Sequence, residues 1–155
     1  LFSTPRILVR QIPSKPPYCI NAVFTDEVII NDLNSMNIID IQCEPLFMLA
    51  VLNSRLISFW FEHKFGKLSR GLFPQFKINE LKRFPIPAAT KEQQAQFASL
   101  ADAMLCAVQK QSAAVSEEDK RIARQRTAAL DAQINAAVYA LYGLTGEEIA
   151  VVEAK

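Results

Sequence analysis

The sequence predicts an α+β fold in which a small, mostly antiparallel sheet with one packed apolar helix precedes a C-terminal helical hairpin or long helices. Before Pro45 the apolar segments are short, rich in β-branched residues and separated by turn formers, as in strands. After Pro45, leucine and aromatic residues recur at helical spacing. From Thr90 to Tyr142 neither glycine nor proline occurs, which favours long helices.

Four strands are predicted in the first part of the chain. Prolines and Asx residues between them, at 13–17 and 31–35, favour turns over strand ladders. The predicted strands are Arg6–Ile12, Cys19–Phe24, Glu27–Ile30 and Met36–Gln42.

One helix is predicted from Pro45 to about His63, ending near Gly66. Its apolar run carries Arg55 and is about 16 residues long, whereas a membrane span needs about 20 apolar residues. We therefore expect a buried helix of a soluble domain and no membrane partner. A loop bounded by Gly66 and Gly71 and a strand at Leu72–Ile78 should follow.

Two prolines in the segment Arg83–Pro87 interrupt regular structure and divide the chain into domain 1–89 and helical segment 90–155. Within the second part, Thr90 and Thr145 each have a Gln or Glu three residues later, the spacing of a capping box. A bend is expected between Ser112 and Asp119, and Gly143 should end the second helix. A 4-3-4 seam of apolar and small residues, typical of helix-on-helix packing, runs along this second helix: Ala123, Thr127, Leu130, Ile134, Ala137 and Leu141.

Composition excludes several classes of protein. The 155 residues are 50% hydrophobic and 21% charged, which excludes an intrinsically disordered chain. The cysteines Cys19, Cys43 and Cys106 are far apart and odd in number, which indicates neither a disulfide framework nor a zinc site and fits the cytoplasm. The chain opens at Leu1 without a secretory pattern, so we expect a fragment of a longer protein.

No catalytic constellation is apparent, so the chain is not expected to be an enzyme by itself. Pro16-Pro17-Tyr18 follows Lys15, where an amino-group methyltransferase needs an acceptor side chain, and lysine only donates. The single histidine, His63, cannot form a triad or a metal site without companions. A helix-terminal role is expected for it.

A basic cluster lies between Arg55 and Arg83, although the whole chain has a net charge of only +1. Seven basic and two acidic residues give this segment a local charge of +5, and Phe65, Phe73 and Phe76 are interleaved with them. A basic loop between glycines can approach a phosphate backbone closely. The alternative is a solvated charged face, and for a second cluster, Lys120 to Arg126, both interpretations stay open.

Several segments together carry a resemblance to a known family. The segment 49–57, the glycine-bounded basic loop and the segment Phe76–Pro87 resemble the TaqI-like C-terminal specificity domain of adenine-specific DNA methyltransferases and type IIG restriction-modification enzymes. The opening strand Arg6–Arg10 is similar to the start of such domains. The ending Ile134–Val152 is similar to the tails of these proteins and of type I specificity subunits.

The resemblance implies that residues 1–89 are a target-recognition domain for double-stranded DNA and that residues 90–155 support it or form a homodimer. A methyltransferase domain of the same parent chain, lying N-terminal, would bind S-adenosylmethionine and methylate a flipped adenine. Placement and chemistry favour six DNA-binding side chains: Lys67, Arg70, Gln75 and Lys77 toward bases, and Lys64 and Lys82 toward phosphates. The alternative is a helical protein-interaction or oligomerisation module without DNA readout.

Overall fold

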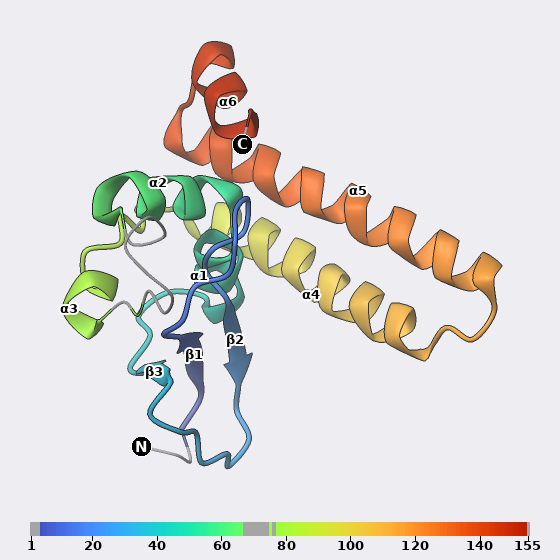
Figure 1. The fold of residues 1–155 in the computed structure, drawn as a ribbon, viewed down its shortest axis with the longest axis horizontal. Helices are drawn as coiled ribbons and strands as arrows, with labels where there is room; N and C mark the ends of the chain where they lie inside the picture. The colour runs from blue at the N-terminus through green and yellow to red at the C-terminus, as the bar shows by residue number, and fades with distance from the viewer. Residues whose placement is uncertain (1–3, 67–74, 76, 155) are drawn as a thin grey trace.

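The computed structural model describes residues 4–66, 75 and 77–154 and has the predicted α+β architecture (Figure 1). A three-stranded antiparallel sheet in the order β2-β1-β3 is followed by helices. The strands are β1 (Arg6–Arg10), β2 (Ala22–Thr25) and β3 (Ser35–Ile38). The helices are α1 (Pro45–Leu52), α2 (Arg55–Phe65), α3 (Ile78–Leu81), α4 (Lys91–Ala113), α5 (Glu117–Tyr142) and α6 (Gly146–Glu153).

The core begins on the central strand β1. Ile7 and Val9 alternate toward one face and are fully buried, as expected for a sheet with one covered face. Helix α1 lies between this sheet and α4, and its Phe47 meets Phe97 of α4 edge to face, with ring centroids 5.4 Å apart. One continuous core therefore joins residues on both sides of the proline segment, while the rest of the α4–α5 hairpin projects from it (Figure 1).

The predicted strand Glu27–Ile30 is wrong, because these residues form an irregular loop between β2 and β3. Backbone carbonyl oxygens that would pair with a neighbouring strand accept hydrogen bonds from a side chain instead. The guanidinium of Arg6, a fully buried residue, donates to the carbonyl of Glu27 at 3.3 Å and to that of Ile29. The last predicted strand is also shorter than expected and ends at Ile38.

The single helix predicted from Pro45 to His63 is two helices. Pro45 begins α1 as predicted, but the helix ends at Leu52 and α2 begins at Arg55. The Ser54 side chain accepts from the backbone N–H of Ile57 at 3.3 Å, so it is an N-cap for α2. The apolar run is nevertheless buried, and no helix in the described part of the chain is long and apolar enough to cross a membrane.

The predicted strand Leu72–Ile78 falls mostly outside the described residues, and its last residue is helical. Ile78 opens the short helix α3, and the backbone N–H of Lys77 donates to the Glu80 carboxylate at 2.7 Å. Glu80 lies at the third position of α3 and caps its start, so this glutamate is the short-range feature of the sequence that favours a helix here. Before this segment, Gly66 ends α2 in the left-handed conformation with φ 55°, as the glycine predicted.

The helical predictions for the C-terminal part are confirmed. Thr90 and Thr145 form capping boxes at the starts of α4 and α6, and the chain bends between Ala113 and Glu117. Gly143 ends α5 with φ 68°. The seam of α5 runs along α4, where Thr127 hydrogen-bonds to Gln111, and then enters the core, with Leu130 and Ile134 buried.

Candidate nucleic-acid interface

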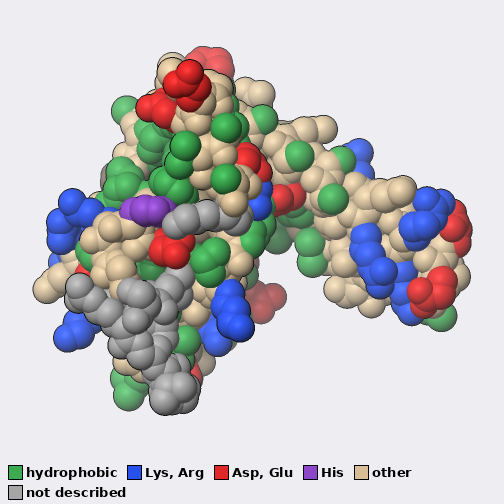
Figure 2. Space-filling view, turned by 45° about the horizontal axis from the view of Figure 1, so that its top comes forward, with side chains coloured by type: hydrophobic (Ala, Val, Ile, Leu, Met, Phe, Trp, Pro, Cys, Tyr) green, Lys and Arg blue, Asp and Glu red, His purple; other side chains and the backbone are tan. Residues whose placement is uncertain are grey.

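Four exposed basic side chains gather around the end of α2 and around α3. Lys64 lies in the last turn of α2, Lys77 precedes α3, and Lys82 and Arg83 follow it. Within the part of the chain that is described, none of these four forms an ion pair. We call Lys64, Lys77, Lys82 and Arg83 the α2–α3 basic surface. Figure 2 shows Lys and Arg side chains on this half of the molecule and a separate group at the far end of the hairpin.

An aromatic cluster holds this surface in place. The Trp60 ring meets Phe65 and Phe84 edge to face, with centroids 5.6 and 5.5 Å apart, and Phe61 lies 6.0 Å from Phe84. These rings connect the end of α2 to the segment that follows α3, although about 20 residues separate them in the sequence. The basic side chains are therefore presented on a packed aromatic base, which fixes where their stems begin.

One acidic residue in the same region, Glu80, acts as a cap at the start of α3. The Glu80 carboxylate accepts the backbone N–H of Lys77 and faces the start of α3. The Arg83 guanidinium lies over the Phe65 ring, 5.5 Å from its centroid, a cation–π contact that leaves the edges of the guanidinium available to an anion. The basic cluster of the sequence includes Arg83, but the six predicted DNA-binding residues do not. The contact between Arg83 and Phe65 depends on the tertiary structure, so no short-range pattern in the sequence predicts it.

The six predicted DNA-binding residues divide into two groups. Lys64, Gln75, Lys77 and Lys82 are exposed around α3 and the end of α2. Lys67 and Arg70 lie outside the described residues. The four that are described thus share one region of the surface, and their roles toward DNA remain predictions.

Arg55, which the basic cluster included, does not belong to this surface. Its guanidinium forms an ion pair with Glu153 of α6 and lies 5.8 Å from the Tyr18 ring centroid. Its backbone N–H donates to Asn135 Oδ1 of α5 at 2.9 Å. Arg55 therefore joins the start of α2 to the C-terminal helices, and its charge is balanced within the fold.

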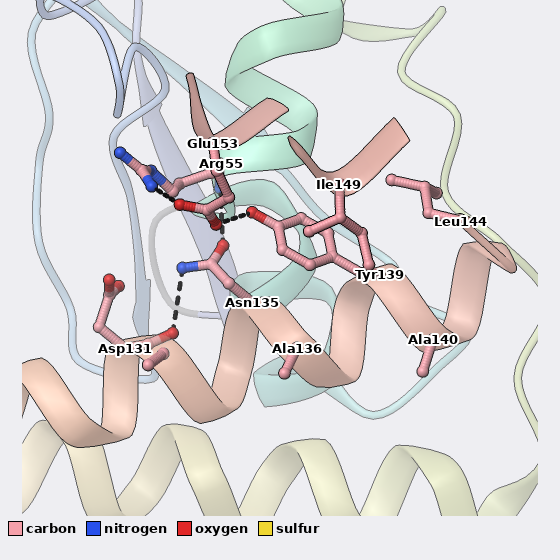
Figure 3. Close-up of a pocket in the computed structure, with 10 residues that line it drawn as sticks. Arg55, Asp131, Asn135, Ala136, Tyr139, Ala140, Leu144, Ile149 and Glu153 are labelled. Carbon is pink, nitrogen blue, oxygen red and sulfur yellow. Dashed lines mark hydrogen bonds and ion pairs between the residues drawn. The ribbon is translucent and has the colours of Figure 1, made fainter. Parts of the chain in front are cut away.

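A polar network continues from Arg55 along a groove of about 610 Å³ between α5 and α6 (Figure 3). Asn135 Nδ2 donates to the Tyr18 hydroxyl at 3.0 Å, and that hydroxyl donates to the Asp131 carboxylate. On the other side, the Tyr139 hydroxyl donates to Glu153 at 2.5 Å. Burial, together with the Asp131 carboxylate, raises the pKa of Tyr18 well above its usual value. The network consists of groups already paired with one another, which suits a structural joint rather than a reaction centre.

Tyr18 and His63 are both engaged in contacts within the fold. Tyr18 follows a cis Pro16–Pro17 peptide and belongs to the polar network just described. The His63 ring lies 4.0 Å from the Phe59 ring, and its Nδ1 is 2.7 Å from the Phe59 carbonyl oxygen one turn earlier. Across the described residues, no group of three or more His, Cys, Asp or Glu side chains is placed to hold a metal ion.

The second basic cluster is balanced in part by its own helix. Lys120 pairs with Glu117 at 2.8 Å and Arg121 with Glu118 at 2.5 Å, both one turn apart at the start of α5. Arg121 holds the pKa of Glu118 below its usual value. These pairs favour a solvated helix face at Lys120 and Arg121, while Arg124 and Arg126 are exposed beyond them.

Comparison with known proteins identifies the first part of the chain. A family model described as the TaqI-like C-terminal specificity domain matches residues 1–86. The chain belongs to this family. No curated protein and no solved structure matches the chain. The matched residues of the specificity domain include the sheet, α1 to α3 and the whole α2–α3 basic surface, and the match ends where the proline segment leads into α4.

Proposed function

We propose that this chain is a sequence-specific recognition module for double-stranded DNA and that the α2–α3 basic surface contacts the duplex. Membership of a specificity-domain family is the observation that carries the proposal. The geometry supports it, because four exposed cations lie on one packed aromatic base within the family-matched residues. Such a surface can neutralise phosphates and release their counterions.

The six residues predicted from the sequence divide between positioning and reading. Lys64 and Lys82 are assigned to phosphates, and Arg83 joins them. Lys67, Arg70, Gln75 and Lys77 are assigned to base edges, where arginine pairs with guanine and glutamine with adenine. Phosphate contacts then set the register in which these four side chains meet the bases.

The parent protein is proposed to be an S-adenosylmethionine-dependent, adenine-specific DNA methyltransferase or a type IIG restriction-modification enzyme of the cytoplasm. Its catalytic domain would precede this chain and hold S-adenosylmethionine, while this chain holds the duplex so that one adenine can be flipped. The chain itself supplies no catalytic residue in this scheme.

The salt dependence of duplex binding tests the proposal in the full-length protein. Binding should weaken with a slope of about −0.9 per neutralised phosphate in a plot of log affinity against log salt. A Lys82→Ala, Arg83→Ala variant should bind more weakly with a shallower slope, because two phosphate contacts are lost. The matched control is Lys120→Ala, Arg121→Ala, which removes equal charge from residues already paired on α5. Equal effects of the two double variants would contradict the proposed surface.

A second candidate function has one observation in its favour. The α4–α5 hairpin projects from the body and exposes four aliphatic side chains: Leu105, Val108, Val115 and Ile122. These could pair two copies of the chain as a helical oligomerisation module. Light scattering across a dilution series tests it, because an Ile122→Asp variant should then dissociate a dimer that the unmodified protein forms.

A further inference from the structure

The loop between β2 and β3 exposes four large aliphatic side chains within six consecutive residues. Val28 is 76% exposed, Ile29 38%, Ile30 83% and Leu33 94%. Single exposed aliphatic residues are ordinary, but several on one short loop form a patch of the kind that binds another surface. We call residues 26–34 the apolar loop.

Hydrogen bonds from side chains hold the apolar loop in one conformation. Arg6 donates from beneath to the carbonyls of Glu27 and Ile29. At the other end, Asp32 Oδ1 accepts the backbone N–H of Asn34 at 3.0 Å, and Asn31 Nδ2 donates to the Ser35 carbonyl at 3.2 Å. The aliphatic side chains are thus exposed on a braced loop, which lowers the ordering cost of binding.

The charge of the apolar loop selects the kind of surface it can meet. Asp26, Glu27 and Asp32 carry three negative charges, and residues 26–34 contain no lysine or arginine. Phosphates of DNA or of an anionic membrane would be repelled. The loop also lies at the end of the sheet remote from α2, away from the proposed DNA contact (Figure 1). A protein face with an apolar centre and lysine or arginine at its rim is complementary to it.

Arg6 also connects this loop to the place where the polypeptide enters the sheet. Its Nη1 donates to the Thr4 carbonyl at 3.2 Å as well as to that of Glu27. Thr4, where the described part of the polypeptide begins, therefore lies beside the apolar loop. A domain attached there has a high effective concentration at the loop, so a modest patch suffices to dock it.

We infer that the apolar loop is the docking surface for the domain that precedes this one in the same polypeptide. This inference rests on the part of the proposed function that places a catalytic domain N-terminal to the specificity domain. It assigns the two ends of the sheet domain different partners: the basic end binds DNA, and the acidic, apolar end binds protein.

Thiol labelling of the full-length protein tests this inference. Leu33→Cys is compared with Val151→Cys, a 58% exposed aliphatic position on α6, and each site is quantified by peptide mapping so that native cysteines do not interfere. Leu33→Cys should react about tenfold or more slowly, because a docked thiol reacts only from the undocked fraction. Adding Glu27→Lys should speed the labelling of Leu33→Cys, since it repels a basic rim.

Each other outcome overturns the inference. Equal rates at the two sites would show that the apolar loop is open to solvent in the full-length protein. Protection that appears only with duplex DNA would make the loop a DNA contact, and protection that disappears on dilution would assign it to a second copy. Labelling without DNA does not depend on the α2–α3 basic surface. Failure of the DNA proposal would therefore be seen in the salt dependence of duplex binding and not in the labelling rates.

Discussion

The side-chain amide of Asn53 pairs with the backbone of Ala22 in both directions. The Ala22 N–H donates to Asn53 Oδ1 at 2.8 Å, and Asn53 Nδ2 donates to the Ala22 carbonyl at 2.9 Å. Asn53 thus acts as one extra strand residue at the free edge of β2, an outer strand of the sheet. The break between α1 and α2 is thereby attached to the sheet, and this sets where α2 begins.

Asn53→Ala should lower the free energy of unfolding by about 1–3 kcal/mol, because Ala22 loses the partners of its N–H and its carbonyl. Urea denaturation measures the change. Asn79→Ala, at an exposed asparagine of α3, is the matched control and should change stability by at most a few tenths of a kcal/mol. A similar small effect at both positions would mean that water replaces the Asn53 amide at no cost.

Stability should fall in alkali because of the half-buried phenol of Tyr18. Burial and Asp131 raise the pKa of Tyr18 above its usual value of 10.0, so the folded state holds the proton more tightly than the unfolded state does. This contribution is complete below about pH 10 and is lost as pH rises beyond it. Urea unfolding at a series of pH values should show a smaller alkaline decline in Tyr18→Phe than in the unmodified protein. Burial raises the pKa of Tyr142 as well, so part of the decline should remain. An unchanged decline in Tyr18→Phe would contradict the assignment.

Gly143→Ala should destabilise the protein by roughly 1 kcal/mol. Gly143 has φ 68°, and a Cβ there would meet no atom within 4 Å, so the cost is conformational alone. Gly146→Ala is a close control, because an added Cβ is equally free of contacts and the residue lies in the first turn of α6. That variant should be neutral or slightly stabilising in thermal unfolding. Equal losses at both glycines would contradict a left-handed cap at the end of α5.

Single substitutions should separate phosphate contacts from base readers in the full-length protein. Lys64→Ala is expected to weaken binding to all duplexes alike, because a phosphate contact carries no sequence information. Arg70→Ala and Gln75→Ala should instead reduce discrimination at one base pair each, by about 1–3 kcal/mol. Competition binding against a library of duplexes measures both effects. A uniform loss from all three changes would contradict the assignment of readers.

Elements with local signals were predictable from the sequence. The capping boxes at Thr90 and Thr145 and the glycine after α5 define helix ends by interactions within one turn, so spacing alone reveals them. The family could also be predicted from motif residues, and the match over residues 1–86 confirmed it. The cluster of basic residues was visible as a count of charges along the chain.

Elements governed by one distant side chain were not predictable. The stretch at 27–30 has the composition of a strand, but Arg6, about 20 residues away, occupies its carbonyls. The helix from Pro45 is broken because Asn53 pairs with β2 and Ser54 caps α2. Arg55 was counted with the basic cluster, yet it pairs with Glu153 almost 100 residues away.

The sequence by itself determined the fold class, the starts of α4 and α6, the end of α5 and the family, because helical and strand periodicity and capping act over a few residues. Only the tertiary structure decided which polar side chains are used inside the fold and which remain on its surface. Hydrogen bonds and ion pairs of Arg6, Asn53 and Arg55 form between segments that the fold brings together, and such pairing depends on geometry rather than spacing. Arg6 and Arg55 are used inside the fold, whereas four basic side chains of the proposed DNA contact stay exposed: Lys64, Lys77, Lys82 and Arg83.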